Sequence, residues 1–332
     1  MTLAAVPDGT PVEEATDALL ARGIGDGLPV VPPTRERWER MLGGVAEPDA
    51  VLGAVPPLWG ELTASAVAYY CVLAGCRPGA LPVVLAAARA CLEPAFNLLG
   101  VATTTGTAAV AVVVHGPLLR DLGLTTGTNL LGPGNRANAT LGRALALTLT
   151  GMGGVVPGVT TMATTGQPGR YTFCLAESDD APYPRLAERR GVGAGEDAVT
   201  VMAVGGTAEV LPRDKLPAPD DILQPLAELL CGAALAAGDP ARMAGAEQSI
   251  VLPPEVAARL AGALPRLEAV QQQLFSLGNA ALCARTGRAG LRVAVDPEAI
   301  APILAGGPGV KMLHLPGWIG ASRAVTHRVA GR

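Results

Sequence analysis

The chain has 332 residues, of which 49% are hydrophobic and only 16% are charged, enough apolar material for one large core or two smaller ones. The formal net charge is −4 and no stretch is rich in Lys and Arg, which argues against a nucleic-acid partner because phosphate binding needs a basic surface. Purely apolar runs, such as the one at 108–114, are far shorter than the roughly 20 residues that cross a bilayer, so we expect no membrane partner.

The start of the chain and the cysteine pattern indicate the compartment. The first twenty residues lack a basic segment followed by an apolar core, so we expect no signal peptide and a cytoplasmic location. The six cysteines form no CxxC pair and should be reduced there. None of the three histidines stands at zinc-ligand spacing, so no metal is expected.

The first third of the chain predicts mostly helices. Pro11 opens a helix over 11–22, and Thr34 caps a second over 34–43. The apolar segment 28–31 between them is predicted to be a strand or an extended arm. Helices over 61–75 and 78–92 are rich in Ala, Val and Leu nearly all round, which is typical of buried helices.

Strands are predicted in the middle of the chain. A Thr-rich loop within 98–115 leads into a Val/Ala run without alternation, which favours a buried strand. Further strands are predicted at "YTFCLA" (171–176) and over 197–206. The polar, Pro-rich stretch 207–220 is predicted to link a main domain, 1–206, to a smaller α/β domain, 221–332.

The smaller domain alternates helix and strand, predicted in the order helix 222–237, strand 248–252, helices 254–285, strand 291–296 and helix 297–304. This alternation predicts an α/β fold with mixed sheets and buried Ala/Val/Leu-rich helices. An apolar strand, a proline turn and a helix recur at 28–42 and 249–264, and more loosely at 292–304. Either this is weak internal repetition, or proline simply marks the start of a helix after a strand, as it commonly does.

The segment "LLGPGNRANATLGRALALTLTGMGG" (130–154) is the most informative stretch. "LGPG" excludes a helix, Asn135 or Asn138 is a suitable N-cap, and Gly151 is a suitable helix end. Ordinary capping explains one asparagine, but it does not explain two asparagines and two arginines within ten residues.

Three polar side chains of this helix share one face. Arg136, Thr140 and Arg143 stand at i, i+4 and i+7, so two guanidiniums and a hydroxyl project near the helix start. The first turn also offers unpaired N–H groups and the positive end of the helix dipole. The segment therefore predicts a carboxylate or phosphate site, and the alternative is a capped core helix whose arginines pair with acids elsewhere.

Other candidate ligand contacts lie in Gly-rich turns. Thr/Gly clusters occur at 103–107, which includes Thr104, at 125–129 and at 160–166, and each is either a plain turn or a ligand-contacting strand end. Asp26, in "GDGLP", is a turn residue or a substrate contact. No cluster matches a nucleotide-binding fingerprint, so no cofactor is expected.

Three residues are candidates for catalysis. Cys174 lies inside a predicted strand near Glu177, as a nucleophile or a buried inert thiol. Glu61, expected to open a helix, is an acid/base candidate or a charge that favours the helix N-terminus. His115 follows a buried strand and is either catalytic or hydrogen-bonded in the core. Cys76, at a helix end, is expected to be structural.

Several stretches together resemble a known bacterial family. They are "GDGLPVVPPTRERWERML", "AGCRPGALPVVLAAARACLEPAFNLLGV", "LGPGNRANATLGRAL", "GQPGRYTFCLAES" and "AGGPG". The family they resemble occurs beside, or fused to, UGSC proteins, which carry a Sec/Cys-Gly-Ser-Cys motif. The resemblance implies redox or C–heteroatom chemistry shared with a thiol or selenol partner. It also implies that the family's characteristic motifs include Asn135, Arg136, Asn138, Thr140, Arg170, Tyr171 and Cys174.

The chain departs from the family pattern in its C-terminal half. It has Pro254, Glu255 and Val256 where the family has Pro-Glu-His. It also has Val-Lys-Met at 310–312 where the family has Lys-His-Ser. A relative with a new substrate, or one that no longer needs its partner, fits these departures.

Two main hypotheses follow. The first is an enzyme on a small carboxylate or acyl substrate, lyase-like (addition, elimination, cyclisation or C–heteroatom chemistry) or a partner-dependent oxidoreductase. The second is a non-catalytic subunit for a thiol or selenol partner, with the apolar helices 61–92 as the interface. A ligand sensor is a third. Because so little of the chain is charged, we also expect a homo-oligomer.

Overall fold

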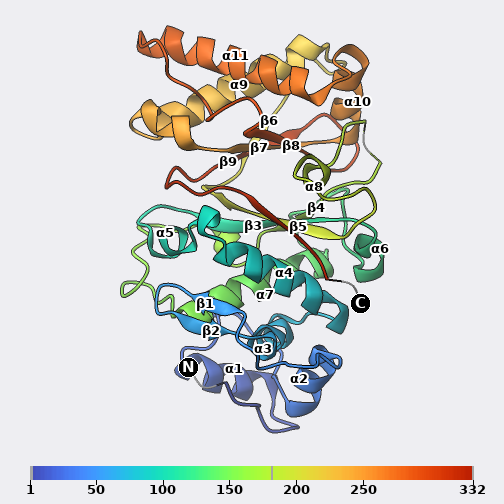
Figure 1. Cartoon of the computed structure of the whole chain (residues 1–332), viewed down its shortest axis with the longest axis vertical. Coiled ribbons are helices and arrows are strands. Elements are labelled where there is room, and N and C mark those ends of the chain that lie inside the picture. The colour runs from blue at the N-terminus through green and yellow to red at the C-terminus, as the bar shows by residue number, and fades with distance from the viewer. Residues whose placement is uncertain (1–2, 181, 331–332) are drawn as a thin grey trace.

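A computed structural model describes residues 3–180 and 182–330, so the extreme ends of the two predicted domains lie outside the described residues. The predicted α/β class is confirmed: mixed sheets pack against helices rich in Ala, Val and Leu. Two four-stranded sheets lie one above the other, with helices at both ends of the molecule (Figure 1).

The first sheet has the strand order β10-β5-β3-β4. Its strands are β3 (Ala109–His115), β4 (Cys174–Ala176), β5 (Ala198–Val204) and β10 (Val325–Arg328). β3 and β4 run parallel, whereas β5 is antiparallel to both β3 and β10. All residues of β5 are buried, which explains its unbroken run of apolar and small side chains.

Helices α3 (Ala64–Ala74), α4 (Leu81–Leu92) and α7 (Arg136–Gly153) form the core below this sheet, with α1 (Val12–Ala21) and α2 (Arg35–Leu42) at the lower end (Figure 1). The predicted burial of the apolar helices is confirmed, since nearly all of α3 and most of α4 is buried. Both helices are therefore enclosed, and the proposed partner interface over 61–92 is wrong.

The start of α3 corrects one expectation. The Thr63 side chain accepts a hydrogen bond from the N–H of Ala66, so the helix begins after Thr63. Glu61 instead lies in the hairpin β1 (Gly53–Val55) and β2 (Gly60–Leu62), which packs against the end of α7. Shorter helices are α5 (Leu98–Thr103), α6 (Leu118–Leu122) and α8 (Leu186–Arg189), with 3₁₀ turns at Pro78–Ala80, Pro94–Phe96, Pro168–Arg170 and Pro240–Gly245.

The second sheet has the order β6-β9-β7-β8. Its strands are β6 (Ala208–Val210), β7 (Gln248–Leu252), β8 (Ile300–Leu304) and β9 (Met312–Pro316). Helices α9, α10 and α11 cover its outer face, as Figure 1 shows, and they span Pro219–Ala236, Pro254–Ala263 and Leu267–Thr286. The inner faces of the two sheets share an apolar layer that includes Val113, Leu175, Val251, Ile303 and Leu315.

The end of the second sheet differs from the predicted strand over 291–296 and helix over 297–304. Residues 291–296 form no strand, and β8 runs over Ile300–Leu304 parallel to β7. Pro302 would break a helix, but β8 is an edge strand, where a missing N–H is tolerated. The loose third copy of the repeat therefore has neither the strand nor the helix that the pattern requires.

The division at 207–220 stays a prediction, although that segment contains β6 and the chain returns through β10 to the first sheet. The helix predicted from 135 onward begins at Arg136 and ends at Gly153 instead of Gly151, with Gly154 in the left-handed conformation.

In the part of the chain that the structure describes, no single helix is long and apolar enough to cross a membrane. Only when Pro78–Leu92 and Pro94–Thr103 are taken together do their length and composition reach what a membrane span needs, and the two helices are bent by 74° relative to each other.

Candidate functional site

A cavity of about 180 Å³ lies at the N-terminal end of α7. Arg77 and Arg136 are among its lining residues, and no acidic residue is. The first turn of an 18-residue helix adds unpaired N–H groups and a partial positive charge. The cavity therefore favours a small anion. The other lining residues are Ala80, Leu122, Gly123, Gly134, Asn135, Ala137, Thr140 and Leu141.

Arg136 is the first residue of α7 and is exposed. Its Nη2 donates a 2.9 Å hydrogen bond to the carbonyl of Gly75, which caps the C-terminus of α3. A guanidinium carries five N–H donors, so one bond to a carbonyl leaves both the charge and further donors for a ligand. Arg136 thus ties two helix ends together and faces the cavity.

Cys76, which the sequence predicted to be structural, lies beside this cavity. It follows the Gly75 cap, and its Sγ lies 3.3 Å from the carbonyl oxygen of Thr140. The hydrogen bond with the Cys71 thiol is the largest cause that lowers the pKa of Cys76, burial opposes it, and Thr140 and the charge of Arg136 lower it further. A thiolate is the reactive form of cysteine, so Cys76 is the thiol best prepared for chemistry at this end of α7.

One sequence signal could have identified Cys76. It stands directly before Arg77 in "AGCRPG", beside a glycine that ends a helix. The approach of Thr140 and Arg136, some sixty residues away, could not be seen in the sequence.

Arg143 and Asp26 pair with each other. Nε and Nη2 of Arg143 donate to the two carboxylate oxygens of Asp26 at 2.7 and 2.8 Å, and Nη2 also donates to the carbonyls of Leu28 and Pro29. Both side chains are largely enclosed. They fasten the 26–29 arm onto α7, so the structure places this pair in a structural role and leaves Arg136 facing the cavity.

The asparagines and Thr140 mostly shape the loop before α7. Asn135 occupies the cap position, but its Nδ2 donates to the carbonyl of Asn129. Asn138 is buried and bonds the N–H and the C=O of Thr125, each at 3.0 Å, which locks one Thr/Gly cluster in place. Thr140 donates to the carbonyl of Arg136 and lines the cavity.

Three further candidates lie elsewhere. Arg170 donates to the carbonyl of Ala108 at 2.9 Å and lines a separate cavity of about 100 Å³ beside α5 and α7. Thr104 accepts a bond from the N–H of Gly106 at the end of α5. Tyr171 is 47% exposed. None of the three is among the residues that line the α7 cavity.

The three catalytic candidates also lie apart. Cys174 is buried in β4, and burial strongly raises the pKa of its thiol, which keeps it protonated. Glu61 lies in β2, by the C-terminal end of α7, about 27 Å along the helix from the cavity. Neither residue is placed to act on a ligand at Arg136.

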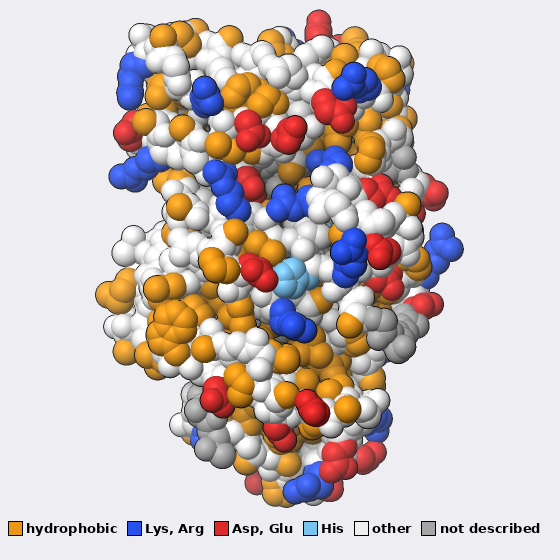
Figure 2. Space-filling model, viewed as in Figure 1, with side chains coloured by type: hydrophobic (Ala, Val, Ile, Leu, Met, Phe, Trp, Pro, Cys, Tyr) orange, Lys and Arg blue, Asp and Glu red, His pale blue; other side chains and the backbone are white. Residues whose placement is uncertain are grey.

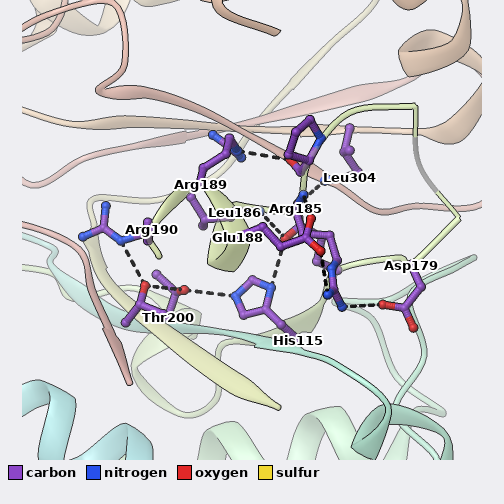
Figure 3. Close-up of polar contacts among 12 residues, drawn as sticks. His115, Asp179, Arg185, Leu186, Glu188, Arg189, Arg190, Thr200 and Leu304 are labelled. Carbon is purple, nitrogen blue, oxygen red and sulfur yellow. Dashed lines mark hydrogen bonds and ion pairs between the residues drawn. The ribbon is translucent and has the colours of Figure 1, made fainter. Parts of the chain in front are cut away.

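His115 belongs to a buried polar network at the end of β3. Its Nδ1 lies 3.0 Å from the Glu177 carboxylate, at ion-pair distance but without hydrogen-bond alignment, and its Nε2 lies 3.0 Å from Oγ1 of Thr200 (Figure 3). Glu177 also accepts the N–H groups of Leu186 and Leu304. His115 is fully buried, so the structure supports the core alternative.

In residues 3–180 and 182–330, no three His, Cys, Asp or Glu side chains converge in a way that could hold a metal ion. The groups that the structure brings together at the start of α7 are Arg77, Arg136, the helix N–H groups and the Cys76 thiol, whose pKa is lowered.

Comparison with known proteins gives no functional assignment, so the proposal below is based on the side chains at the start of α7. No protein-family model matches the chain, and no curated protein matches it. The resemblance to the UGSC-associated family stays a prediction.

Proposed function

We propose that this protein is an enzyme that binds a small carboxylate or acyl substrate in the cavity at the start of α7. The observation that carries the proposal is a cavity lined by two arginines and no acidic residue, at a helix N-terminus. Such a cavity stabilises a bound anion through charge-assisted hydrogen bonds from Arg77, Arg136 and the helix N–H groups.

The proposed chemistry is lyase-like and uses Cys76. Cys76 is not itself among the residues that line the cavity, but it contacts Thr140 and precedes Arg77, both of which line it. As a thiolate, Cys76 would accept a proton from a carbon beside the anchored carboxylate, and the released electron pair would form a double bond as the leaving group departs. Arg136 would stabilise the negative charge that develops on the carboxylate.

Binding of succinate to the full chain, measured by calorimetry, tests the anion site. We expect Arg136→Ala to weaken binding by about tenfold or more, because a charged partner in a partly enclosed site is worth roughly 1.5–3 kcal/mol. Arg259→Ala, on the exposed face of α10, is the matched control and should leave the affinity unchanged. Equal affinities of the wild type and Arg136→Ala would reject the site.

A second candidate function is that of a non-catalytic subunit for a thiol or selenol partner. Exposed apolar side chains favour it, and Figure 2 shows apolar groups gathered over the lower part of the molecule, in the region of β1 and β2. Leu58 and Trp59, in the turn of that hairpin, and Val159 are each at least 60% exposed. The expected homo-oligomer could use the same surface. Turnover by the isolated chain would exclude this candidate.

A further inference from the structure

A second cavity, of about 290 Å³, lies between the two sheets. Its first-sheet side is formed by α8 and by Met202 of β5, and its second-sheet side by Ser249 of β7 and the start of β8. Gln271 of α11 closes one side. Figure 2 shows basic and acidic side chains next to each other on the displayed face at the level where the sheets meet.

Guanidiniums occupy one wall of this cleft. Arg189 and Arg190 extend from the end of α8 to the same side, away from Asp179 (Figure 3). Arg189 donates to the carbonyls of Pro184 and Pro302, and Arg190 donates to Oγ1 of Thr326 and the carbonyl of Ala324. Among the described residues neither guanidinium forms an ion pair, so neutral oxygens orient both cations, while Glu268 acts electrostatically on Arg189 and Glu247 on Arg190 from within the same cleft.

Three carboxylates share the cleft with these guanidiniums. Glu247, Glu268 and Glu298 line the cleft. Glu268 and Glu298 also line an adjoining cavity of about 350 Å³, where Asp296 adds a further carboxylate. The combined groove is therefore mixed in charge at one end and acidic at the other.

The floor of the cleft holds polar groups with incomplete partners. The buried hydroxyl of Ser249 donates to the thioether of Met202 at 3.4 Å, which is a weak acceptor. In a small recess that continues the cleft, Nη1 of Arg323 is buried and has no hydrogen-bond partner among the described residues. A buried N–H without an acceptor costs free energy, so this recess, of about 10 Å³, favours a small hydrogen-bond acceptor the size of a water molecule.

We propose that this cleft binds a basic amino acid. The ligand's carboxylate would meet Arg189 and Arg190 at the mixed end. Its terminal ammonium would lie in the acidic end between Glu268 and Glu298. One ligand with a carboxylate and a distant cation satisfies both ends, and the two adjoining cavities are large enough for a chain of lysine length. The site shares no lining residue with the α7 cavity, so it stands apart from the proposed enzymatic function.

Calorimetry of the full chain with three probes tests the charge pattern. L-lysine carries both ends, L-norleucine lacks the terminal ammonium, and cadaverine lacks the carboxylate. We expect lysine to bind about tenfold or more tightly than either of the others, because each lacks one charged partner. No saturable lysine binding up to about 10 mM, or equal binding of lysine and cadaverine, would overturn the proposal.

Variants locate the binding. Glu298→Gln keeps the shape of an exposed side chain and should weaken lysine binding by about tenfold, while norleucine binding should be unaffected. Arg190→Gln should bring lysine down to the affinity of cadaverine. Glu47→Gln, on an exposed loop far from the cleft in the sequence, is the control and should bind lysine as the wild type does. Lysine binding that survives both cleft variants unchanged would place the ligand elsewhere and overturn the assignment.

Discussion

Cys76 and Arg136 show how a thiol acquires reactivity from residues distant in the sequence. The hydrogen bond with Cys71 is the largest cause that lowers the pKa of Cys76, and the charge of Arg136, whose guanidinium donates to the Gly75 carbonyl at the end of α3, lowers it further. Cys71, which is fully buried, has a strongly raised pKa and therefore remains a thiol that can donate to its partner.

Alkylation by iodoacetamide tests this pair of residues. In a Cys283→Ser background, which removes the exposed cysteine, Cys76 should react faster than the other cysteines at about pH 7.5, because the thiolate is the reactive species. Arg136→Gln should raise the pKa of Cys76 and slow its alkylation several-fold, and Arg259→Gln should not. Faster labelling of Cys174 than of Cys76 would contradict this assignment.

His314 makes stability depend on pH. Burial lowers its pKa to about 4, while its Nε2 lies 2.8 Å from Oε1 of Gln248. Between pH 6.5 and about 4 the unfolded chain therefore binds a proton that the folded chain excludes, so stability falls as pH falls through this window. The loss is about 3 kcal/mol by pH 4. Urea unfolding of the wild type and His314→Gln should show a smaller loss in the variant, and equal losses would exclude His314 as the cause.

At the scale of elements, close packing of α7 against β4 depends on one glycine. A Cβ on Gly142 would lie 2.6 Å from Oγ1 of Thr172 and 2.8 Å from the backbone N of Phe173. The α9 residue Gly232 is also within a helix, but a Cβ there would meet no atom within 4 Å.

These two glycines predict substitutions of opposite sign. Gly142→Ala should destabilise the fold by about 1–3 kcal/mol, since overpacking outweighs the gain in helix propensity. Gly232→Ala should stabilise it by up to about 1 kcal/mol. Thermal or urea unfolding of each variant beside the wild type measures both changes in stability. Stabilisation by Gly142→Ala would show that α7 and β4 pack less closely than the structure indicates.

Hydrophobic periodicity, together with glycine and proline at segment ends, predicted most of the helices and strands. The strand predicted over 248–252 is β7 to the residue, and buried apolar runs also predicted β3 and β5. β9 and β10 were not predicted, because their short alternating stretches gain their order from pairing with β7 and β5. The helix predicted over 297–304 was wrong, because this segment is an edge strand that tolerates Pro302. The local sequence does not show which strand lies at the edge of a sheet.

The candidate site was predicted less completely. The start of α7 could be predicted from its glycines, asparagines and Arg136, since those signals are local. The ion pair of Arg143 could not be predicted, because its partner Asp26 lies 117 residues away in the sequence. Burial of Cys174 and His115 likewise depends on how β3, β4 and β5 assemble.

At the scale of the whole molecule, Glu177 joins the two sheets. Its carboxylate follows β4 of the first sheet and accepts the N–H of Leu304 in β8 of the second, while it also faces His115. Glu177→Ala should destabilise the protein by about 3–5 kcal/mol, because buried donors lose their acceptor. Glu47→Ala is the exposed control, and similar urea midpoints for the two variants would show that this junction contributes little.

The proposed enzyme must hold a small carboxylate at the start of α7, in front of Arg136. A high-resolution crystal structure of the protein soaked with succinate tests it most directly. We expect a carboxylate within hydrogen-bond distance of the Arg136 guanidinium and the first N–H groups of α7. Ordered succinate elsewhere, with the cavity at Arg77 and Arg136 holding none, would contradict it.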